Sequence, residues 1–554
     1  MEGWGIEAVV KPRRNSMPGT GSRARKSFLY KKKKYTVNNN GDEMLSGVKK
    51  EIPGELGNQL KFLTNEELDM IDAAAKDILY RKGVKMPNTE ALDILHKVGC
   101  VVNFEKEIVY IPPYIVDEAV RKTPKSFRYA GRDPRKTLIA DTKRVYFVNG
   151  IGPFMALADG TLKKPTEKDN QDRMRVLDAC EHIDIVSSYV GGSYCPKEDL
   201  GLPLAIRKVR AIARSLEWQT KPVDMSVDYV LDREWIQEDA TQSAKDSVAL
   251  QIAIRGSLDE LRKLPISFAM NEPVSPLMHA AKQIERELVF AKLGLPIFIG
   301  SEPMSNATTP ATLAGTLACW TAETLSALVL GAMAATPGHN PPAVWITIAG
   351  QFDQKAMTGP QLGSPEGSLM QAACAQISHY YGFPIRGICE SASKVPDAQA
   401  GYESALSLVV MAMGGINFNT SIGTVGPGEI ALNLEKIVLD NELAGTVKRV
   451  MQGIKVTEET LAVDVICEVD HGGTFLNHPH TRKHFRKEQY FPKLFDRRKY
   501  EDWVRRGRKD ALQRATERVQ EILKDHWPEP LDADIKKRID EYIQQVEKRE
   551  AKKA

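Results

Sequence analysis

Three glutamates stand directly after short apolar runs that have the composition of buried strands: Glu272, Glu302 and Glu390. Because the carboxyl ends of parallel strands meet at one edge of a sheet or one mouth of a barrel, we expect these carboxylates to converge. Converging carboxylates suit three tasks, namely binding a divalent metal, transferring protons, or holding a cationic ligand. Each glutamate alone is more commonly a solvated loop residue or a helix cap, so only their convergence indicates a site.

Aromatic and polar residues occupy comparable positions near the ends of the same runs. The aromatic ones are Tyr194, Trp345, Phe352 and Phe418, and the polar ones are Gln351, Asn417 and Asn419. Aromatic faces beside carboxylates, without an evident nucleophile, are typical of a quaternary-ammonium site, where cation–π contacts contribute on the order of 2 kcal/mol when desolvated. Packed core is the competing interpretation for Trp345 and Phe418. Arg386 lies inside a strand and would need a carboxylate partner, either Glu390 or a carboxylate on the substrate.

Other chemistries find less support in the sequence. No GxSxG nucleophile motif occurs, and Cys389, at a strand end, has no evident base beside it. His480 and His484 are spaced to share one helix face, but no HExxH motif or Cys pair accompanies them, so we expect no metal site. The seven cysteines are scattered without a CxxC motif, which favours a reducing, cytoplasmic location.

The elements that must position these residues form a regular alternation of strands and helices. Helical stretches separate eight strand-like runs, at 144–148, 183–190, 222–227, 265–270, 296–301, 343–350, 384–389 and 416–421. Eight such units with near-continuous apolar strands predict an α/β fold, a (β/α)8 TIM barrel. A doubly wound open sheet is the alternative, although no GxGxxG or Walker motif follows any strand.

The rest of the 554-residue chain divides by composition. We expect a basic arm at 1–47, an α+β cap or oligomerisation element at 48–140, the barrel at 141–454 and a helical extension at 455–554. The formal charge of +4 is concentrated in the arm, so the body gives no support for binding nucleic acid. The apolar stretch 309–335 carries Glu323 near its centre and reads as a packed or interfacial helix rather than a membrane span, and it hints at a homo-oligomer.

Several long motifs in a fixed order resemble the trimethylamine methyltransferase superfamily of corrinoid-dependent methyltransferases. The resemblance covers roughly 60–545, and its most specific parts are TPATLAG (309–315), GSPE (363–366), YYGFP (380–384), SKVPDAQAGYE (393–403), MQGIKVTEETLAV (451–463) and FLNHPHTR (475–482). The resemblance implies a TIM barrel that demethylates a methylated amine. The methyl group would pass to the cob(I)alamin of a separate small corrinoid protein, so the chain itself would bind no cofactor tightly.

Founding members of that family carry pyrrolysine shortly before the KVPD segment. In this chain the equivalent position is filled by Cys389 or Glu390, both ordinary residues. The resemblance therefore implies the branch that uses quaternary amines such as glycine betaine, carnitine or proline betaine. A quaternary nitrogen leaves as a neutral tertiary amine, so catalysis would consist of positioning and electrostatics.

The sequence leads to one main hypothesis about function and to three alternatives. The main hypothesis is a quaternary amine:corrinoid methyltransferase, with Glu302 and Glu390 supplying negative potential, Tyr194 and Phe352 as cage walls, and Arg386 as a carboxylate clamp. Gln351, Asn417 and Asn419 would be polar contacts. The alternatives are demethylation of trimethylamine or another methylamine, a barrel that binds quaternary amines without turnover, and a metal-dependent lyase or hydrolase using Glu272, Glu302 and a histidine. A ring plugged by side chains at its mouth would contradict the main hypothesis.

Overall fold

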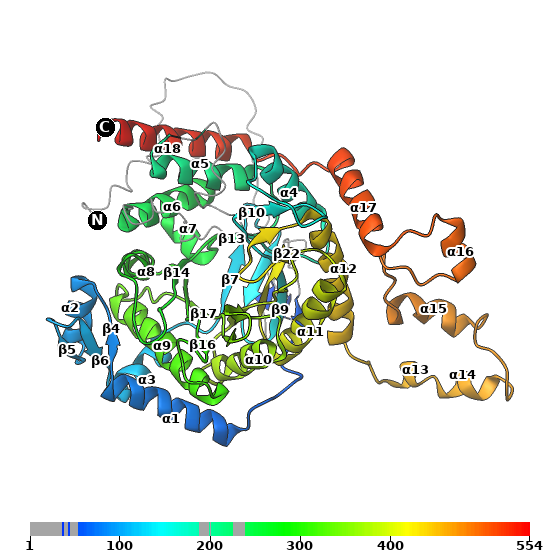
Figure 1. Cartoon of the computed structure of the whole chain (residues 1–554), viewed down its shortest axis with the longest axis horizontal. Coiled ribbons are helices and arrows are strands. Elements are labelled where there is room, and N and C mark those ends of the chain that lie inside the picture. The colour runs from blue at the N-terminus through cyan, green and yellow to red at the C-terminus, as the bar shows by residue number, and fades with distance from the viewer. Residues whose placement is uncertain are drawn as a thin grey trace, which may run out of the picture.

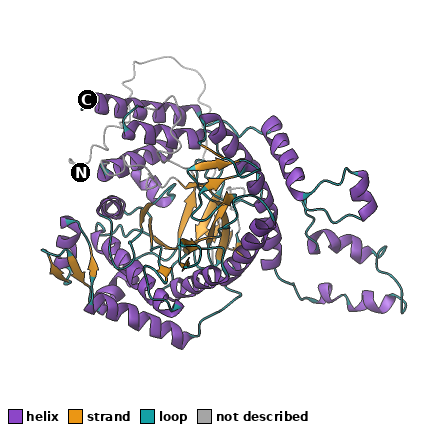
Figure 2. Ribbon diagram, viewed as in Figure 1, coloured by secondary structure: helices purple, strands orange, loops and turns teal. Residues whose placement is uncertain are grey.

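The computed structural model describes residues 54–187, 199, 201–224 and 239–553, and it also places two short strands, β1 (Thr36–Val37) and β2 (Glu43–Met44). Most strands lie at the centre of the molecule with helices around them, and one small sheet lies at its edge (Figure 2).

All eight strand-like runs expected from the sequence carry strands. These are β9 (Arg144–Asn149), β12 (Val186–Ser187), β13 (Val223–Asp224), β14 (Ala269–Asn271), β15 (Ile297–Ile299), β17 (Ala343–Thr347), β20 (Ile385–Ile388) and β21 (Phe418–Ile422). Six of them pair in parallel in the order β14-β15-β17-β20-β21-β9, and β12 pairs in parallel with β13. A single bridge, Val148 to Ile185, connects the two groups. No ladder joins β13 to β14 within the described residues, so the fold is a mixed α/β fold whose sheets are not closed.

A helix follows each of these strands, as the alternating pattern predicts (Figure 1). In chain order they are α4 (Glu167–Ala179), α5 (Leu204–Glu217), α6 (Ala240–Arg255), α8 (Ala281–Leu293), α9 (Leu313–Ala334), α10 (Pro365–Tyr380), α11 (Ala398–Gly414) and α12 (Leu434–Met451), with the short α7 (Leu258–Lys263) after α6. Short polar caps start many of them. For example, Asp397 accepts a hydrogen bond from Ala400 N at the start of α11, and Asn433 accepts one from Lys436 N at the start of α12.

Alternate residues of the strands face inward and form a core inside the sheet. Phe268 and Phe298 stack with their ring centroids 3.4 Å apart, and Phe418 packs beside Phe298 at 6.2 Å. The hairpin β7 (Phe127–Ala130) and β8 (Thr137–Ala140) joins this core through Tyr129 and Leu138. The interior beneath the mouth is therefore packed, which is the usual state of a TIM-type interior. Trp345 faces the opposite way and stacks on Phe383, so Trp345 and Phe418 are core residues.

The N-terminal elements cover α9. They are β3 (Glu55–Leu56), α1 (Asn65–Arg81), β4 (Val84–Lys85), α2 (Thr89–Lys97), β5 (Val101–Asn103), β6 (Ile108–Tyr110) and α3 (Pro113–Lys122). Helices α1, α2 and α3 all pack on α9. This helix is long and apolar enough to cross a membrane, but 89% of its most apolar window is buried in the protein. The chain's own N-terminal helices therefore cover α9, and self-association remains a prediction.

The C-terminal extension has two parts. Helices α17 (Ala511–Asp525) and α18 (Ala533–Ala551) pack on the body, against α12 and α4 and against α5 and α6 respectively. Before them, α13 (Glu458–Leu461), α14 (Val463–Glu468), α15 (Pro479–Glu488) and α16 (Tyr500–Arg505) project away from the body (Figure 1).

Gly300, between β15 and Glu302, allows the strand end to approach its neighbour. A Cβ at this position would lie 1.9 Å from the Ile346 carbonyl oxygen, and its φ is +148°. We therefore expect Gly300→Ala to lower the free energy of unfolding by more than about 4 kcal/mol, or to prevent folding. Gly401→Ala is the control, since that helical glycine has open space around it and alanine should stabilise the protein by roughly 0.5–1 kcal/mol. Denaturant titration of both variants measures the change in the free energy of unfolding. Equal changes in the two variants would contradict the role of Gly300 in the close approach to Ile346.

Candidate active site

Three carboxylates gather on the loops at the carboxyl end of the sheet. Glu302 follows β15, Glu390 follows β20, and Glu429 lies between the short strands β22 (Thr424–Val425) and β23 (Ala431–Leu432) that follow β21. They lie close enough to interact: Glu429 raises the pKa of Glu302, and both Glu429 and Glu302 raise the pKa of Glu390. The structure thus brings together the two glutamates proposed from the sequence and adds a third.

Glu302 is exposed on the loop that follows β15. Solvent reaches its side chain, yet protein surrounds it densely enough for burial to raise its pKa to about 7, with a further contribution from Glu429. Glu302 is therefore exposed at the carboxyl end of the sheet, although the interior below it is packed.

Glu390 is the most enclosed of the three, with 1% of its surface exposed. Burial raises its pKa well above the ordinary value, against the effect of the Gly428 N–H, which donates to Oε1 at 2.9 Å. Its other oxygen, Oε2, has no hydrogen-bond partner among the described residues. The loop that carries it is braced by Glu403, which accepts hydrogen bonds from Ser391 Oγ at 2.8 Å and Ala392 N at 2.7 Å.

Glu429 is the site residue that the sequence reasoning missed. It accepts hydrogen bonds from Ser421 Oγ at 2.6 Å and Ile151 N at 3.3 Å, and burial raises its pKa. Its backbone is in the left-handed region, with φ +53°, an uncommon conformation that clusters at functional sites. The GPGE sequence at 426–429 is the signal that could have found it, since a glycine-rich turn after a strand presents its carboxylate at the same edge.

Gly150, at the end of β9, makes room for this turn. A Cβ there would lie 2.2 Å from Thr424 Cγ2 and 2.5 Å from Glu429 Oε1. The close approach of these two backbone segments fixes Glu429 at the mouth.

Arg386 lies inside the sheet, 5% exposed, beside a small cavity that it shares with Phe268, Phe298 and Phe418. One guanidinium nitrogen approaches Met270 Sδ at 4.0 Å. Its charge lowers the pKa of Glu429, opposing the larger effect of burial. A buried guanidinium needs a carboxylate nearby, and for Arg386 that carboxylate is Glu429.

Gln351 and Phe352 belong to a small sheet next to Glu302. This sheet consists of β16 (Met304–Ser305), β18 (Gly350–Asp353) and β19 (Thr358–Gln361), and β16 begins two residues after Glu302. Both side chains are half-buried. Tyr194, the other proposed cage wall, lies outside the described residues. Glu272 is half-buried after β14 and is not among the groups that shift the pKa of the three glutamates.

Asn419 and Cys389 face away from the mouth. Asn419 donates to Ile416 O at 2.9 Å, and Cys389 Sγ lies 3.6 Å from Met411 Sδ on α11. Because side chains alternate along a strand, the residues next to them, Thr420 and Glu390, take the inward side. Asn419 is therefore not placed to contact a ligand at the mouth, and of the two pyrrolysine-equivalent candidates only Glu390 points toward it.

Asn417 lies at the opposite end of the sheet, before β21 begins. Its Oδ1 accepts from Ile385 N at 2.9 Å and contacts His379 Nε2 at 3.0 Å, while its Nδ2 donates to Arg144 O at 2.8 Å. These hydrogen bonds tie together the amino ends of β9, β20 and β21. The structure therefore places Asn417 away from the mouth.

We expect Asn417→Leu to lower the free energy of unfolding by about 3 kcal/mol, because it leaves buried backbone groups without partners. The KM for substrate should stay unchanged in the folded fraction. Denaturant unfolding and steady-state kinetics test the two halves separately. If the variant instead has a raised KM and the stability of the wild type, Asn417 contacts the substrate.

Within the described residues, no group of three or more His, Cys, Asp and Glu side chains is arranged to hold a metal ion. His480 and His484 stack with their ring centroids 4.3 Å apart in the projecting arm, far along the chain from the three glutamates.

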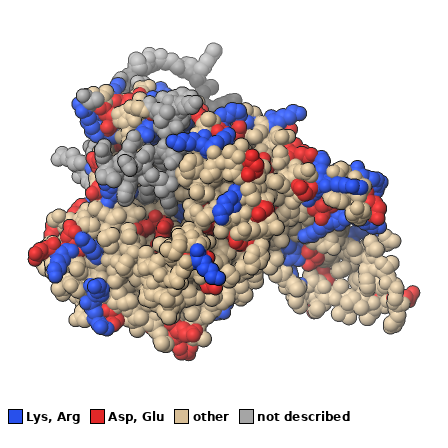
Figure 3. Space-filling model, viewed as in Figure 1, with Lys and Arg blue, Asp and Glu red and all other residues tan. Residues whose placement is uncertain are grey.

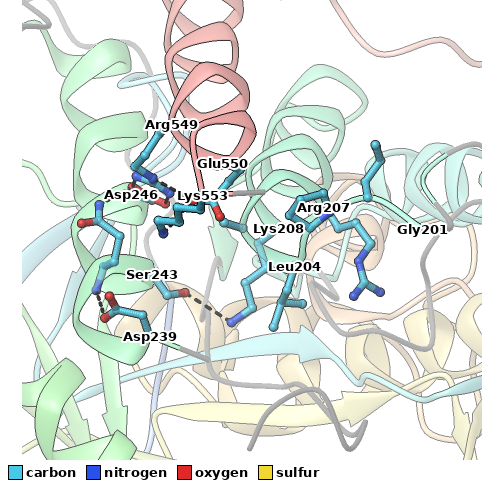
Figure 4. Close-up of a pocket in the computed structure, with 14 residues that line it drawn as sticks. Gly201, Leu204, Arg207, Lys208, Asp239, Ser243, Asp246, Arg549, Glu550 and Lys553 are labelled. Carbon is cyan, nitrogen blue, oxygen red and sulfur yellow. Dashed lines mark hydrogen bonds and ion pairs between the residues drawn. The ribbon is translucent and has the colours of Figure 1, made fainter. Parts of the chain in front are cut away.

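A separate surface pocket lies between α5, α6 and α18 (Figure 4). Several side chains that line this pocket hydrogen-bond to one another. Arg549 donates to Asp246 through two nitrogens at 2.7 Å each, and Lys208 donates to Ser243 at 3.3 Å. It contains neither the three glutamates nor an aromatic wall, so it is a weaker candidate than the mouth.

A repeat of parallel strands and helices with coupled carboxylates at its carboxyl edge is the architecture of an α/β enzyme with an acidic site. The chain belongs to the trimethylamine methyltransferase (MTTB) family, whose model matches residues 30–552. It is an amine methyltransferase by this membership.

Named relatives share most of the chain. Identity is 32% with the trimethylamine methyltransferase MttB of Desulfitobacterium hafniense (strain DSM 10664 / DCB-2), covering 87% of this chain and 93% of that protein. It is 33% with MttB of Methanosarcina thermophila, covering 87% and 96%. It is 28% with the glycine betaine methyltransferase of D. hafniense (strain Y51), covering 89% and 98%. Among solved structures, the Methanosarcina barkeri monomethylamine methyltransferase matches with a TM-score of 0.45 and 11% identity, covering 83% of this chain and 93% of that chain.

Proposed function

We propose that the protein transfers a methyl group from a quaternary amine to the cob(I)alamin of a separate corrinoid protein. The observation that carries this proposal is the group of three glutamates on the loops at the carboxyl end of the sheet, where burial raises the pKa of each. Carboxylates held close together in a poorly solvated place disfavour one another's charge. A permanent cation among them relieves that cost, so the site is built for a positive ligand.

The reaction requires no proton transfer from the protein. The cobalt(I) lone pair attacks one methyl carbon, a Co–C bond forms, and the C–N bond breaks with its electron pair going to nitrogen. The products are methyl-Co(III) and a neutral tertiary amine. The cation is held by the carboxylates of Glu302, Glu390 and Glu429. The aromatic rings of Phe352 and Tyr194 contact it and orient one methyl group toward the mouth.

The proposal includes a closed (β/α)8 ring, in which β13 and β14 meet and the mouth admits the corrinoid domain. It assigns 48–140 to a cap, 141–454 to the barrel and 455–554 to a C-terminal extension, in a cytoplasmic protein. Glu390 takes the place that pyrrolysine holds in the founding members. Arg386, with Glu429 near it, would reach the carboxylate of a betaine, and Gln351 would be a polar contact.

Trimethylamine is the second candidate substrate. The relatives named trimethylamine methyltransferases are 32% and 33% identical, against 28% for the glycine betaine methyltransferase. Trimethylamine is cationic only when protonated, whereas a betaine is cationic at every pH, and this difference separates the two.

The test combines the purified protein, a reduced corrinoid protein and one amine at a time: glycine betaine, carnitine, proline betaine and trimethylamine. The appearance of methyl-Co(III) is followed by absorbance. We expect turnover with a betaine and little with trimethylamine. Turnover with trimethylamine alone would select the second candidate, and tight betaine binding by calorimetry without methyl transfer would reduce the protein to a binding module.

A further inference from the structure

A fourth carboxylate, that of Glu323, is buried in the middle of α9. Glu323 has none of its surface exposed, whereas Figure 3 shows charged side chains spread over the visible face of the molecule. Burying a carboxylate costs free energy unless hydrogen bonds replace those that it made with water. A helix that packs on a sheet ordinarily presents an apolar side chain at such a position, so Glu323 requires a specific explanation.

Four neutral donors compensate for the burial of Glu323. Its Oε2 accepts hydrogen bonds from Ser275 Oγ at 2.8 Å and from Ser301 Oγ at 2.5 Å. Its Oε1 accepts from the backbone N–H of Leu277 at 2.8 Å and from Cys319 Sγ at 3.4 Å. Burial raises the pKa of Glu323, and the four donors oppose that effect. A carboxylate has about four acceptor positions, so the protein itself occupies them all and none is left for a ligand.

Three of these donors belong to two loops at the carboxyl end of the sheet. Ser301 directly precedes Glu302 after β15, and it has none of its surface exposed. Ser275 and Leu277 lie on the loop between β14 and α8, where the backbone of Leu277 is in the left-handed region, with φ +56°. Strands β14 and β15 are neighbours in the sheet. Glu323 therefore joins the loops that follow two adjacent strands, and one of these loops carries a glutamate of the candidate site.

The segment that carries Glu302 is also fixed from a second direction. Gly300 approaches Ile346 O of β17 so closely that a Cβ would lie 1.9 Å from that oxygen. Trp320 Nε1 donates to the same oxygen at 3.0 Å. Trp320 and Glu323 are three residues apart and share one face of α9. The backbone before Glu302 is therefore placed by contacts with both β17 and α9.

We propose that Glu323 is a positioning residue for Glu302. By holding Ser301, it restricts the backbone from which the Glu302 side chain extends, and it thereby sets where the Glu302 carboxylate stands relative to the substrate cation. Glu302 itself is exposed, so the conformation of its loop depends on the buried residue beside it. Glu323 acts through this loop and does not touch the substrate. The inference rests on the proposed function, in which Glu302 holds the cation.

The first experiment measures kcat/KM for methyl transfer from glycine betaine, or from whichever of the four amines named above the wild type uses. Glu323→Leu should lower kcat/KM at least about 10-fold, because small displacements of a positioned group slow a reaction strongly. Ser301→Ala removes only the hydrogen bond to the Glu302 segment and should give a similar loss. It also replaces Glu323→Leu in the comparison if that variant does not fold.

Two further variants serve as rescue and control. Glu323→Gln should stay within about 3-fold of the wild type, because serine hydroxyls can accept hydrogen bonds from an amide as well as donate them. Thr324→Val is the matched control. Thr324 is equally buried on α9, but its hydroxyl donates within the helix, to Trp320 O at 2.8 Å, so kcat/KM should not change.

A double-mutant cycle separates positioning from a general structural role. If Glu323 acts through Glu302, then Glu323→Leu should change kcat/KM by less than about 2-fold in a Glu302→Gln background. A residue that only supports the fold would lower kcat/KM by the same factor in both backgrounds.

Amide hydrogen exchange of residues 297–306 provides a readout that needs no methyl transfer. Exchange in this segment should be at least about 10-fold faster in Glu323→Leu and in Ser301→Ala than in the wild type, since each loses a hydrogen bond to a carboxylate. Exchange in residues 385–392, around Glu390, should stay unchanged. The Thr324→Val control should match the wild type in both segments.

Three outcomes would overturn the proposal. The first is wild-type kcat/KM and exchange in both Glu323→Leu and Ser301→Ala. The second is an equal loss of kcat/KM from Glu323→Leu in the two Glu302 backgrounds, and the third is a loss in Glu323→Gln as large as that in Glu323→Leu. A wild-type protein that transfers no methyl group from any of the four amines would contradict the proposed function instead. The exchange of residues 297–306 then decides alone whether Glu323 holds the Glu302 segment.

Discussion

Glu302→Gln is expected to lower kcat/KM for a quaternary amine by about 100-fold. At roughly 5 Å and an effective dielectric constant of about 20, one carboxylate stabilises a cation by about 3 kcal/mol, or two orders of magnitude. Glutamine keeps the shape and removes the charge. Glu541→Gln, exposed on α18, is the control and should leave kcat/KM unchanged.

The same glutamate should give the reaction its dependence on pH. A permanent cation prefers ionised Glu302, and the pKa of Glu302 is about 7. The kcat/KM of the wild-type protein should therefore fall as the pH drops through about 7, and the Glu302→Gln variant should lose this limb of the profile. A profile that is flat through pH 7 in the wild type would contradict the role of Glu302.

Stability should move in the opposite direction from activity. A carboxyl whose pKa is raised on folding contributes stability that is present below its ordinary value of 4.5 and is lost as the pH rises through about 7. Above that pH, Glu302→Gln should be more stable than the wild type. A variant that loses both activity and stability would indicate a structural role.

Glu287→Gln is the second large expected effect, and it concerns stability alone. Glu287, on α8, is fully buried, accepts a hydrogen bond from Asn271 Nδ2 at 2.5 Å, and has its pKa raised by burial to about 8. Asn271 in turn contacts His279, whose pKa burial lowers to about 3. This neutral network lies between β14 and its covering helices.

The sign follows from the direction of the shift. Stability contributed by Glu287 is complete below pH 4.5 and is lost as the pH rises through about 8. A rise of this size corresponds to on the order of 5 kcal/mol. The glutamine of the Glu287→Gln variant is neutral at every pH and should abolish this loss. At pH 9 the variant should therefore unfold at a higher denaturant concentration than the wild type.

Denaturant midpoints measured between pH 5 and pH 9 test this prediction. Glu285→Gln, two residues away on the same helix and only half-buried, should follow the wild-type curve. If the denaturant midpoint of the wild type does not decrease as the pH rises from 5 to 9, Glu287 is ionised in the folded protein.

The positions of the eight strands followed from local sequence alone, because each is a short apolar run bounded by prolines, glycines or polar residues. The same logic found Glu302 and Glu390, since both follow a strand directly. Membership of the family also rested on the sequence, through long motifs in a fixed order.

Tertiary structure decided which neighbours share a face. A shift of one residue along a strand turns a side chain to the other side, so Cys389 and Asn419 pack outward although Glu390 points inward. Asn417 stands at the start of its run, 416–421, and only the structure shows that its side chain bonds to β9 and β20 at the amino ends of these strands. Glu429 depended on a hairpin, β22 to β23, whose short strands have no pattern of their own.

Two further features could not be read from local pattern for the same reason. The covering of α9 by α1, α2 and α3, and the exposure of α13 to α16, depend on contacts between segments far apart in the chain. An apolar helix has the same sequence whether its own chain or another covers it. Local composition therefore determined the elements and their order, while long-range packing decided which groups meet at the mouth and which surface stays open.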